Sequence, residues 1–397
     1  MEHDVNISMN TILPILAKFF FFIWVVFIPM KTSVYQISFV GIVGTFLIYL
    51  YTNKKLPMLK NLFLEQKNIL FAFGFILVSM TTSNALSPVA TLDSWSAEFQ
   101  YLFRYFFMFA ILLLFHKEDI FSKKFIVIAI LLSLFIQGID GIYQSLFEVD
   151  FIKNNAGSLS EGLSGATFNR NNFCFFMSIG ASICTGLLFY SKEYKLEKIH
   201  ITTLITLLSV FLFNLLFSYS RASWLFYSVF SFILFAVEYK RISNKHFVFF
   251  LIIILLTALI FFHFDDLFLR LYQLIKLNDG GRYPIWHDVL HLIKENFIFG
   301  YGLMTYQYIA SQPILSVHNS VLEILLFLGI VGFIAFTALL YFILDAIIKA
   351  KNYFYLAFFC AFLVISQFDN SIIKGITSLS TLSIFAFFIF AKETNKE

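Results

Sequence analysis

Arginine and histidine side chains occur in this sequence at the ends of long apolar segments. Arg221 lies in the short stretch SYSRASW, and Arg282 follows a glycine pair in GGRYPIW. A guanidinium group is planar and permanently charged, which suits it to gripping phosphate or carboxylate. His318, in SVHNSVLEIL, precedes Asn319 and a new apolar segment. Because a neutral imidazole beside a hydroxyl group is a competent general base, these residue types predict proton abstraction next to a bound anion.

Four further residues, Arg170, Arg104, Asn319 and Asp369, are candidates for substrate binding, and three of them have a structural alternative. Arg170 lies between asparagines in TFNRNNF, where the asparagines can simply cap a helix. Arg104 lies a few residues into a predicted apolar helix, from which it can reach the same anion or snorkel to the surface. Asp369, in SQFDNS, can orient His318 or an arginine, or cap a helix end.

The composition defines the environment of these residues. Of the 397 residues, 59% are hydrophobic, only 13% are charged, and 56 are phenylalanine. A soluble domain would have too few polar residues to cover its surface. The apolar segments are roughly 17–22 residues long, which fits a bilayer core and is too long for barrel strands. The predicted fold class is therefore all-α, a polytopic membrane helical bundle.

Lysine placement predicts the topology of about twelve spans. The spans are expected near 12–29, 34–51, 69–86, 101–115, 125–145, 172–190, 199–217, 222–237, 247–264, 319–347, 353–368 and 373–391. The first is interpreted as a span and not a signal peptide, since no cleavage site follows it. Alternate connections carry two or more basic residues, whereas the segment 87–100 carries none. This pattern predicts that both termini are cytoplasmic.

The predicted topology separates arginine from lysine. Of the six arginines only Arg241 falls in a predicted cytoplasmic loop, and the other five lie on or just inside the outer face. Chance in a lysine-rich chain is one explanation. The other is an anion-binding site on the outer face, and the chemistry of arginine favours it.

One connection is far longer than the others and suggests three regions. We expect membrane helices over 1–264, a large outer loop with two amphipathic helices over 265–318, and further membrane helices with a cytoplasmic tail over 319–397. The sequence contains no nucleotide-binding motif, and its three cysteines have no metal-ligand spacing. No metal, cofactor or nucleic-acid partner is therefore expected.

Several motifs resemble the O-antigen ligase family of bacterial inner-membrane glycosyltransferases. They are SYSRASW, GRYPIW with FGYGLMTYQ, and VHNSVLEILLFLGIVGF, all within residues 218–335, and TFNRNNF is similar to a further family pattern. The resemblance implies a multi-pass protein of the inner membrane whose active site faces the periplasm. The implied donor is a glycan on undecaprenyl pyrophosphate, and the implied acceptor is a sugar hydroxyl of the lipid A core glycolipid.

The resemblance also implies roles for individual residues. Arg221 and Arg282 would hold the pyrophosphate, His318 would deprotonate the acceptor, and Asp369 would match a position in the last outer loop. The pyrophosphate gains negative charge as it leaves, so fixed guanidinium groups would stabilise the transition state without a metal or a nucleotide.

Three alternatives remain open at this point. The same superfamily contains O-antigen polymerases and protein O-oligosaccharyltransferases, which this sequence does not separate from ligases. A lipid-glycan flippase or other transporter would also consist of about twelve spans. Transporters often have two related halves and essential polar residues deep in the membrane, whereas the distinctive polar residues here gather at one predicted face.

Overall fold

The structure is a computed structural model that describes residues 9–30, 33–167, 169–241, 262–276, 280–310 and 316–368, with isolated positions between 248 and 260. Within this part of the chain every regular element is helical, as predicted. The helices are α1 Met9–Phe27, α2 Ser33–Thr52, α3 Leu56–Glu65, α4 Lys67–Leu86, α5 Leu92–Tyr101, the π-helical turn η1 Leu102–Phe106, α6 Phe107–Lys117, α7 Lys123–Phe147, α8 Arg170–Phe189, α9 Lys198–Phe217, α10 Arg221–Val237, α12 Asp265–Ile275, α13 Arg282–Glu295, α14 Tyr306–Ile309, α15 Ser320–Lys349 and α16 Tyr353–Ile365.

Seven helical segments of the described residues are long and apolar enough to cross a membrane: α2, α4, the continuous segment Leu92–Lys117, α7, α8, α9 and α15. Three shorter apolar helices, Thr11–Phe27, Arg221–Val237 and Tyr353–Ile365, accompany them. The predicted span 373–391 and most of 247–264 lie outside the described residues. The protein is thus a multi-pass membrane protein, while the count of twelve spans stays a prediction.

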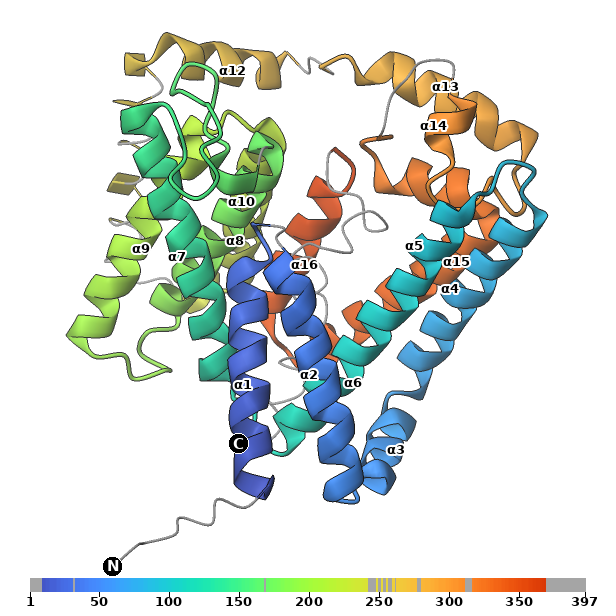
Figure 1. The fold of residues 1–397 in the computed structure, drawn as a ribbon. Coiled ribbons are helices and arrows are strands. Elements are labelled where there is room, and N and C mark those ends of the chain that lie inside the picture. Colours follow the sequence, from blue (N-terminus) through green and yellow to red (C-terminus); the bar gives the residue numbers. More distant parts are fainter. Residues whose placement is uncertain are drawn as a thin grey trace, which may run out of the picture.

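Two groups of helices flank a central pair (Figure 1). The pair is α1 and α2, which pack closely together. On one side lie α7, α8, α9 and α10, and on the other lie α4, α5, α6 and α15. The contacts of α16 with α10 and with α15 connect the two groups. Helices α12 and α13 extend across one end of the bundle, in the segment for which two amphipathic helices are expected.

The span predicted at 101–115 is wrong in its start, because the helix begins at Leu92. At its start the Ser94 hydroxyl accepts a hydrogen bond from Thr91 N–H at 3.2 Å. Glu98, which makes this stretch look too polar for a span, accepts a hydrogen bond of 2.8 Å from Asn84 of α4. Because a polar group in a membrane helix is tolerated when a neighbouring helix satisfies it, hydropathy alone sets this boundary too late.

Helix α15 is interrupted at Gly329, whose φ is +64° and ψ −165°. The segment 297–302 fills the break with backbone hydrogen bonds. Ile330 N–H donates to the Phe297 carbonyl and Tyr301 N–H to the Leu326 carbonyl, each at 2.9 Å. Irregular backbone inside a membrane protein needs such partners, since lipid offers none. The end of the loop that contains α13 is thereby fixed against α15.

Candidate functional site

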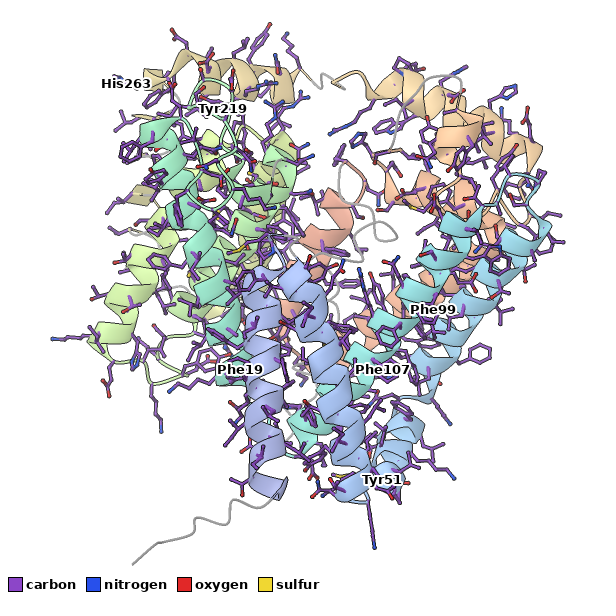
Figure 2. The ribbon with its side chains drawn as sticks, in the orientation of Figure 1. Phe19, Tyr51, Phe99, Phe107, Tyr219 and His263 are labelled. Carbon is purple, nitrogen blue, oxygen red and sulfur yellow. The ribbon has the colours of Figure 1, made fainter. Side chains whose placement is uncertain are left out.

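Arg221 is the first residue of α10, directly after a tight turn. Tyr219 takes a left-handed conformation in this turn, with φ +57°, and its side chain is buried. Figure 2 shows Tyr219 beneath α12. Burial, followed by the nearby carboxylate of Asp266, raises the pKa of Tyr219, and the charge of Arg270 opposes this. Trp224 anchors the turn from the other side, since its indole N–H donates to the Leu215 carbonyl at 2.7 Å.

The chain of the large loop passes directly over the guanidinium of Arg221. Gly280 and Gly281 have φ values of +65° and +82°, and a Cβ on Gly280 would lie 2.9 Å from Nη2 of Arg221. Gly281 is the N-cap of α13 and Arg282 its first residue. Glycine at both positions allows the left-handed backbone, and at the first it also leaves room for the arginine. The glycine pair therefore brings the starts of α10 and α13 together.

Trp286 connects α13 to His318. It lies one turn after Arg282, and its indole N–H donates to the carbonyl of Val317 at 3.1 Å. Val317 is fully buried, whereas the next residue, His318, is half-buried and has φ +54°. Histidine is one of the residues enriched in this left-handed region. The backbone around His318 is thus held from the α13 side.

Asn319 holds His318 from the opposite side. Its side-chain oxygen accepts from Leu322 N–H at 3.0 Å and caps α15. Its amide N–H donates to the Gln367 carbonyl at 3.2 Å, and Ser320 N–H donates to the Ser366 carbonyl at 2.8 Å. Because both ends of the Asn319 amide bind within the protein, the residue fixes the backbone beside His318, and its substrate contact stays a prediction.

A folded connection between α7 and α8 precedes Arg170. Two buried residues of α7 organise it. The Asp140 carboxylate accepts from Phe151 N–H and from Ala166 N–H, each at 2.9 Å. Gln144 accepts from the backbone N–H groups of residues 164 and 165 at the same distance. A carboxylate inside a membrane span is energetically costly. The hydrogen bonds of Asp140 to two backbone N–H groups compensate this cost and hold the connection between α7 and α8 in place.

The α7–α8 connection joins Arg170 to the Arg221 turn. Arg170 is the first residue of α8, with Asn169 as its N-cap, and its guanidinium donates to the Glu161 carbonyl at 3.2 Å. Leu163, two residues after Glu161, donates its backbone N–H to the Phe217 carbonyl at 2.9 Å, and Phe217 is the last residue of α9 before the Arg221 turn. A continuous series of contacts therefore leads from Arg170 through Arg221 and Arg282 to His318.

The three arginines share one position on their helices, which Lys67, Lys123 and Lys198 take at the starts of α4, α7 and α9. Arg170, Arg221 and Arg282 are each a first helical residue, and none of the three first turns contains an acidic residue. A helix N-terminus already carries partial positive charge, so a cation there is unfavourable by roughly 0.3–1 kcal/mol. Helix N-termini and guanidinium groups both attract phosphate. These features make the three helix starts candidates for binding a phosphate-bearing anion.

Arg104 is not part of this series of contacts. Arg104 lies twelve residues after the start of its helix at Leu92, and it faces Tyr35 of α2 with its guanidinium carbon 5.7 Å from the ring centre. It is therefore deeper in its span than predicted. Asp369 lies outside the described residues.

Some residues that build this site carry only weak signals in the sequence. Gly280 is visible as half of a glycine pair, which predicts a helix break but not the arginine beneath it. Trp286 is visible as an interfacial aromatic residue without an indicated partner. The pairing of Asp140 with backbone N–H groups far along the chain has no sequence signature.

The fold is that of a multi-pass membrane protein, and candidate anion-binding arginines begin three of its helices. The O-antigen ligase family model matches residues 204–337. This segment contains Arg221, Arg282 and His318, and it is similar to the O-antigen ligase family, which confirms the predicted resemblance. The match indicates a membrane glycosyltransferase of the O-antigen ligase or polymerase type. No curated protein matches the sequence.

Proposed function

We propose that the protein is an O-antigen ligase that moves a glycan from undecaprenyl pyrophosphate to a sugar hydroxyl of the lipid A core. The reaction would take place on the periplasmic face of a bacterial inner membrane. The observation that carries the proposal is the placement of three arginines at helix starts along one series of contacts, which continues to His318. A pyrophosphate has the charge that such a site favours.

In the proposed reaction, the bond between the anomeric carbon and the pyrophosphate breaks, and its electron pair leaves with the pyrophosphate. Arg221 and Arg282 stabilise the negative charge that develops there. The acceptor hydroxyl oxygen forms the new glycosidic bond, and its proton passes to His318. Arg170 and Asp369 are assigned to binding of the sugar and phosphate groups around this centre.

Deleting the gene and separating the surface glycolipids on a gel tests the proposal. A ligase deletion leaves bare lipid A core while polymer accumulates on undecaprenyl pyrophosphate. Wild type should restore capped cores, and His318→Ala should not. His291→Ala is the matched control, because His291 lies exposed on α13 and pairs with Glu295 of the same helix. Immunoblots must show all variants in the membrane at similar levels.

Two results would overturn the proposal. Cores that carry a single repeat unit after deletion would identify a polymerase. Restoration of capped cores by His318→Ala would exclude this histidine as the general base. Arg282→Lys gives a second test, since a lysine keeps the charge but loses the bidentate fork, and it should restore capping only weakly.

A further inference from the structure

A second cationic feature lies away from the series of contacts described above. A cavity of about 290 Å³ lies between α2 and the helix that contains Arg104. It is lined by Tyr35, Gln36, Phe39, Val40, Phe99, Gln100, Phe103 and Arg104. All of these belong to α2, α5 or η1, so the helices that begin at Arg221 and Arg282 contribute nothing to its wall.

Arg104 is not satisfied by the protein. Its Nη1 atom is buried and has no hydrogen-bond partner among the described residues. The contact with the Tyr35 ring is its only charge-compatible interaction in the described part of the chain. At 1.5 Å per residue, Arg104 lies about 18 Å along the helix from Leu92, near the middle of a 26-residue span. An uncompensated guanidinium at this depth is unfavourable and indicates a function, here the binding of an anion.

The local backbone also distinguishes this position. Arg104 is at the centre of η1, a π-helical turn in an otherwise α-helical span. Such single-turn bulges are frequent at functional sites, because they turn a side chain away from the regular helical repeat. Gln36 and Gln100 contribute amide groups to the cavity wall, which can donate to an anion beside the guanidinium.

The edge of the cavity is apolar and lies on the outer surface of two candidate membrane helices. Val40 and Phe99 line the cavity and are 61% and 64% exposed, respectively, on helices that span the membrane. Figure 2 shows Phe99 and Phe107, which precede and follow Arg104 on this helix, beside α2. The cavity can hold a phosphate and the atoms next to it, whereas a lipid chain would have to lie outside on Val40 and Phe99. A water-borne anion would gain nothing from that apolar edge.

We propose that this cavity binds the phosphate group of a membrane lipid, with Arg104 as its anchor and the lipid chain along Val40 and Phe99. The proposal is independent of glycan transfer, because it concerns a different cavity and its test measures lipid binding. An arginine–phosphate hydrogen bond is charge-assisted and gains strength where water is excluded.

Native mass spectrometry of the purified full chain in a neutral detergent tests the proposal. The probes are phosphatidylglycerol, the diacylglycerol with the same chains, and inorganic phosphate as a competitor. We expect phosphatidylglycerol to bind more tightly than diacylglycerol, and inorganic phosphate at millimolar concentration not to displace it. Arg104→Met should weaken phosphatidylglycerol binding by about tenfold or more.

Two further variants separate the site from general effects. Lys18→Met removes a cation from the exposed side of another membrane helix, α1, and should leave binding unchanged. Val40→Trp fills the cavity while keeping Arg104, and it should weaken binding. Since Arg104 Nη1 has no partner in the described protein, Arg104→Met should not lower the thermal unfolding midpoint in lipid-free detergent.

Four outcomes would overturn the proposal. Equally tight binding of phosphatidylglycerol by Arg104→Met and wild type is the first, and equally tight binding of diacylglycerol and phosphatidylglycerol is the second. Displacement by inorganic phosphate would identify the ligand as a free anion. A large fall in the unfolding midpoint of Arg104→Met, with Val40→Trp binding lipid normally, would give the arginine a structural role only.

Discussion

Replacing one of two adjacent glycines by alanine tests how the large loop positions Arg221. Gly280 and Gly281 both have positive φ, so alanine at either position costs roughly 1–2 kcal/mol of folding free energy. Only at Gly280 would the new methyl group meet another part of the protein, 2.9 Å from Nη2 of Arg221. At Gly281 nothing lies within 4 Å of it. The two variants therefore share the backbone cost and differ in the contact with Arg221.

The expected difference is in activity. A guanidinium at the end of a flexible side chain moves away more easily than a backbone does, so Gly280→Ala should displace Arg221 with little further loss of stability. If Arg221 binds the leaving pyrophosphate, the displacement removes a charge-assisted interaction of roughly 1.5–3 kcal/mol. Each 1.36 kcal/mol changes a rate tenfold. Gly280→Ala should therefore transfer glycan about 10- to 150-fold more slowly than Gly281→Ala.

The assay is transfer from a purified undecaprenyl-pyrophosphate glycan to lipid A core at saturating acceptor, together with a thermal unfolding midpoint for each variant. Similar midpoints with unequal rates support the reasoning. Equal rates for the two glycine variants would refute it, because the contact with Arg221 would then have no consequence. In an Arg221→Ala background the two glycine substitutions should have equal effects, since the group that the methyl displaces is gone.

Three further substitutions test the supports of the site. Trp286→Phe keeps an aromatic side chain, although a smaller one, but removes the N–H that holds the Val317 carbonyl. Transfer should slow several-fold, at about 1 kcal/mol for one hydrogen bond, and an unchanged rate in the same assay would contradict this. Asp140→Asn weakens acceptance from two backbone N–H groups, so hydrogen exchange in the α7–α8 connection should accelerate, and unaltered protection would argue against its role. Gly329→Ala would drive a methyl group into a loop carbonyl and should prevent folding, whereas Gly44→Ala meets nothing within 4 Å; comparable yields on size-exclusion chromatography would disprove the difference.

The sequence predicts the candidate residues better than the connections between them. Arg221 and Arg282 stand out because arginine is rare in the chain and both lie beside turns. His318 stands out because a polar pair precedes a long apolar segment. Each of these interpretations depends only on residues that are neighbours in the sequence. The contact between Arg221 and Gly280 joins residues far apart in the sequence, and local composition holds no information about it.

Hydropathy also fails where a polar group finds its partner on another helix. Glu98 makes residues 92–100 look like a loop, yet Asn84 of α4 satisfies it and the helix continues. The misplaced boundary in turn places Arg104 near the surface, when it lies about halfway through its span. The break at Gly329 is hidden for the converse reason, since the sequence around it is uniformly apolar and the interruption depends on backbone partners from the segment 297–302.

The placement of arginine at three helix starts is an argument for a bound anion. Serine, aspartate or glutamate in the first turn would stabilise each helix, whereas Arg170, Arg221 and Arg282 each oppose the helix dipole. At roughly 0.3–1 kcal/mol for each, three such starts together lower the stability by about 1–3 kcal/mol, a large part of the 5–15 kcal/mol that holds a typical domain together. An anion bound among them reverses the sign of all three contributions at once. Sequences depart from local stability rules in this way at functional sites. Lysines also begin α4, α7 and α9, so the phosphate-binding chemistry of arginine, and not the position alone, carries the interpretation.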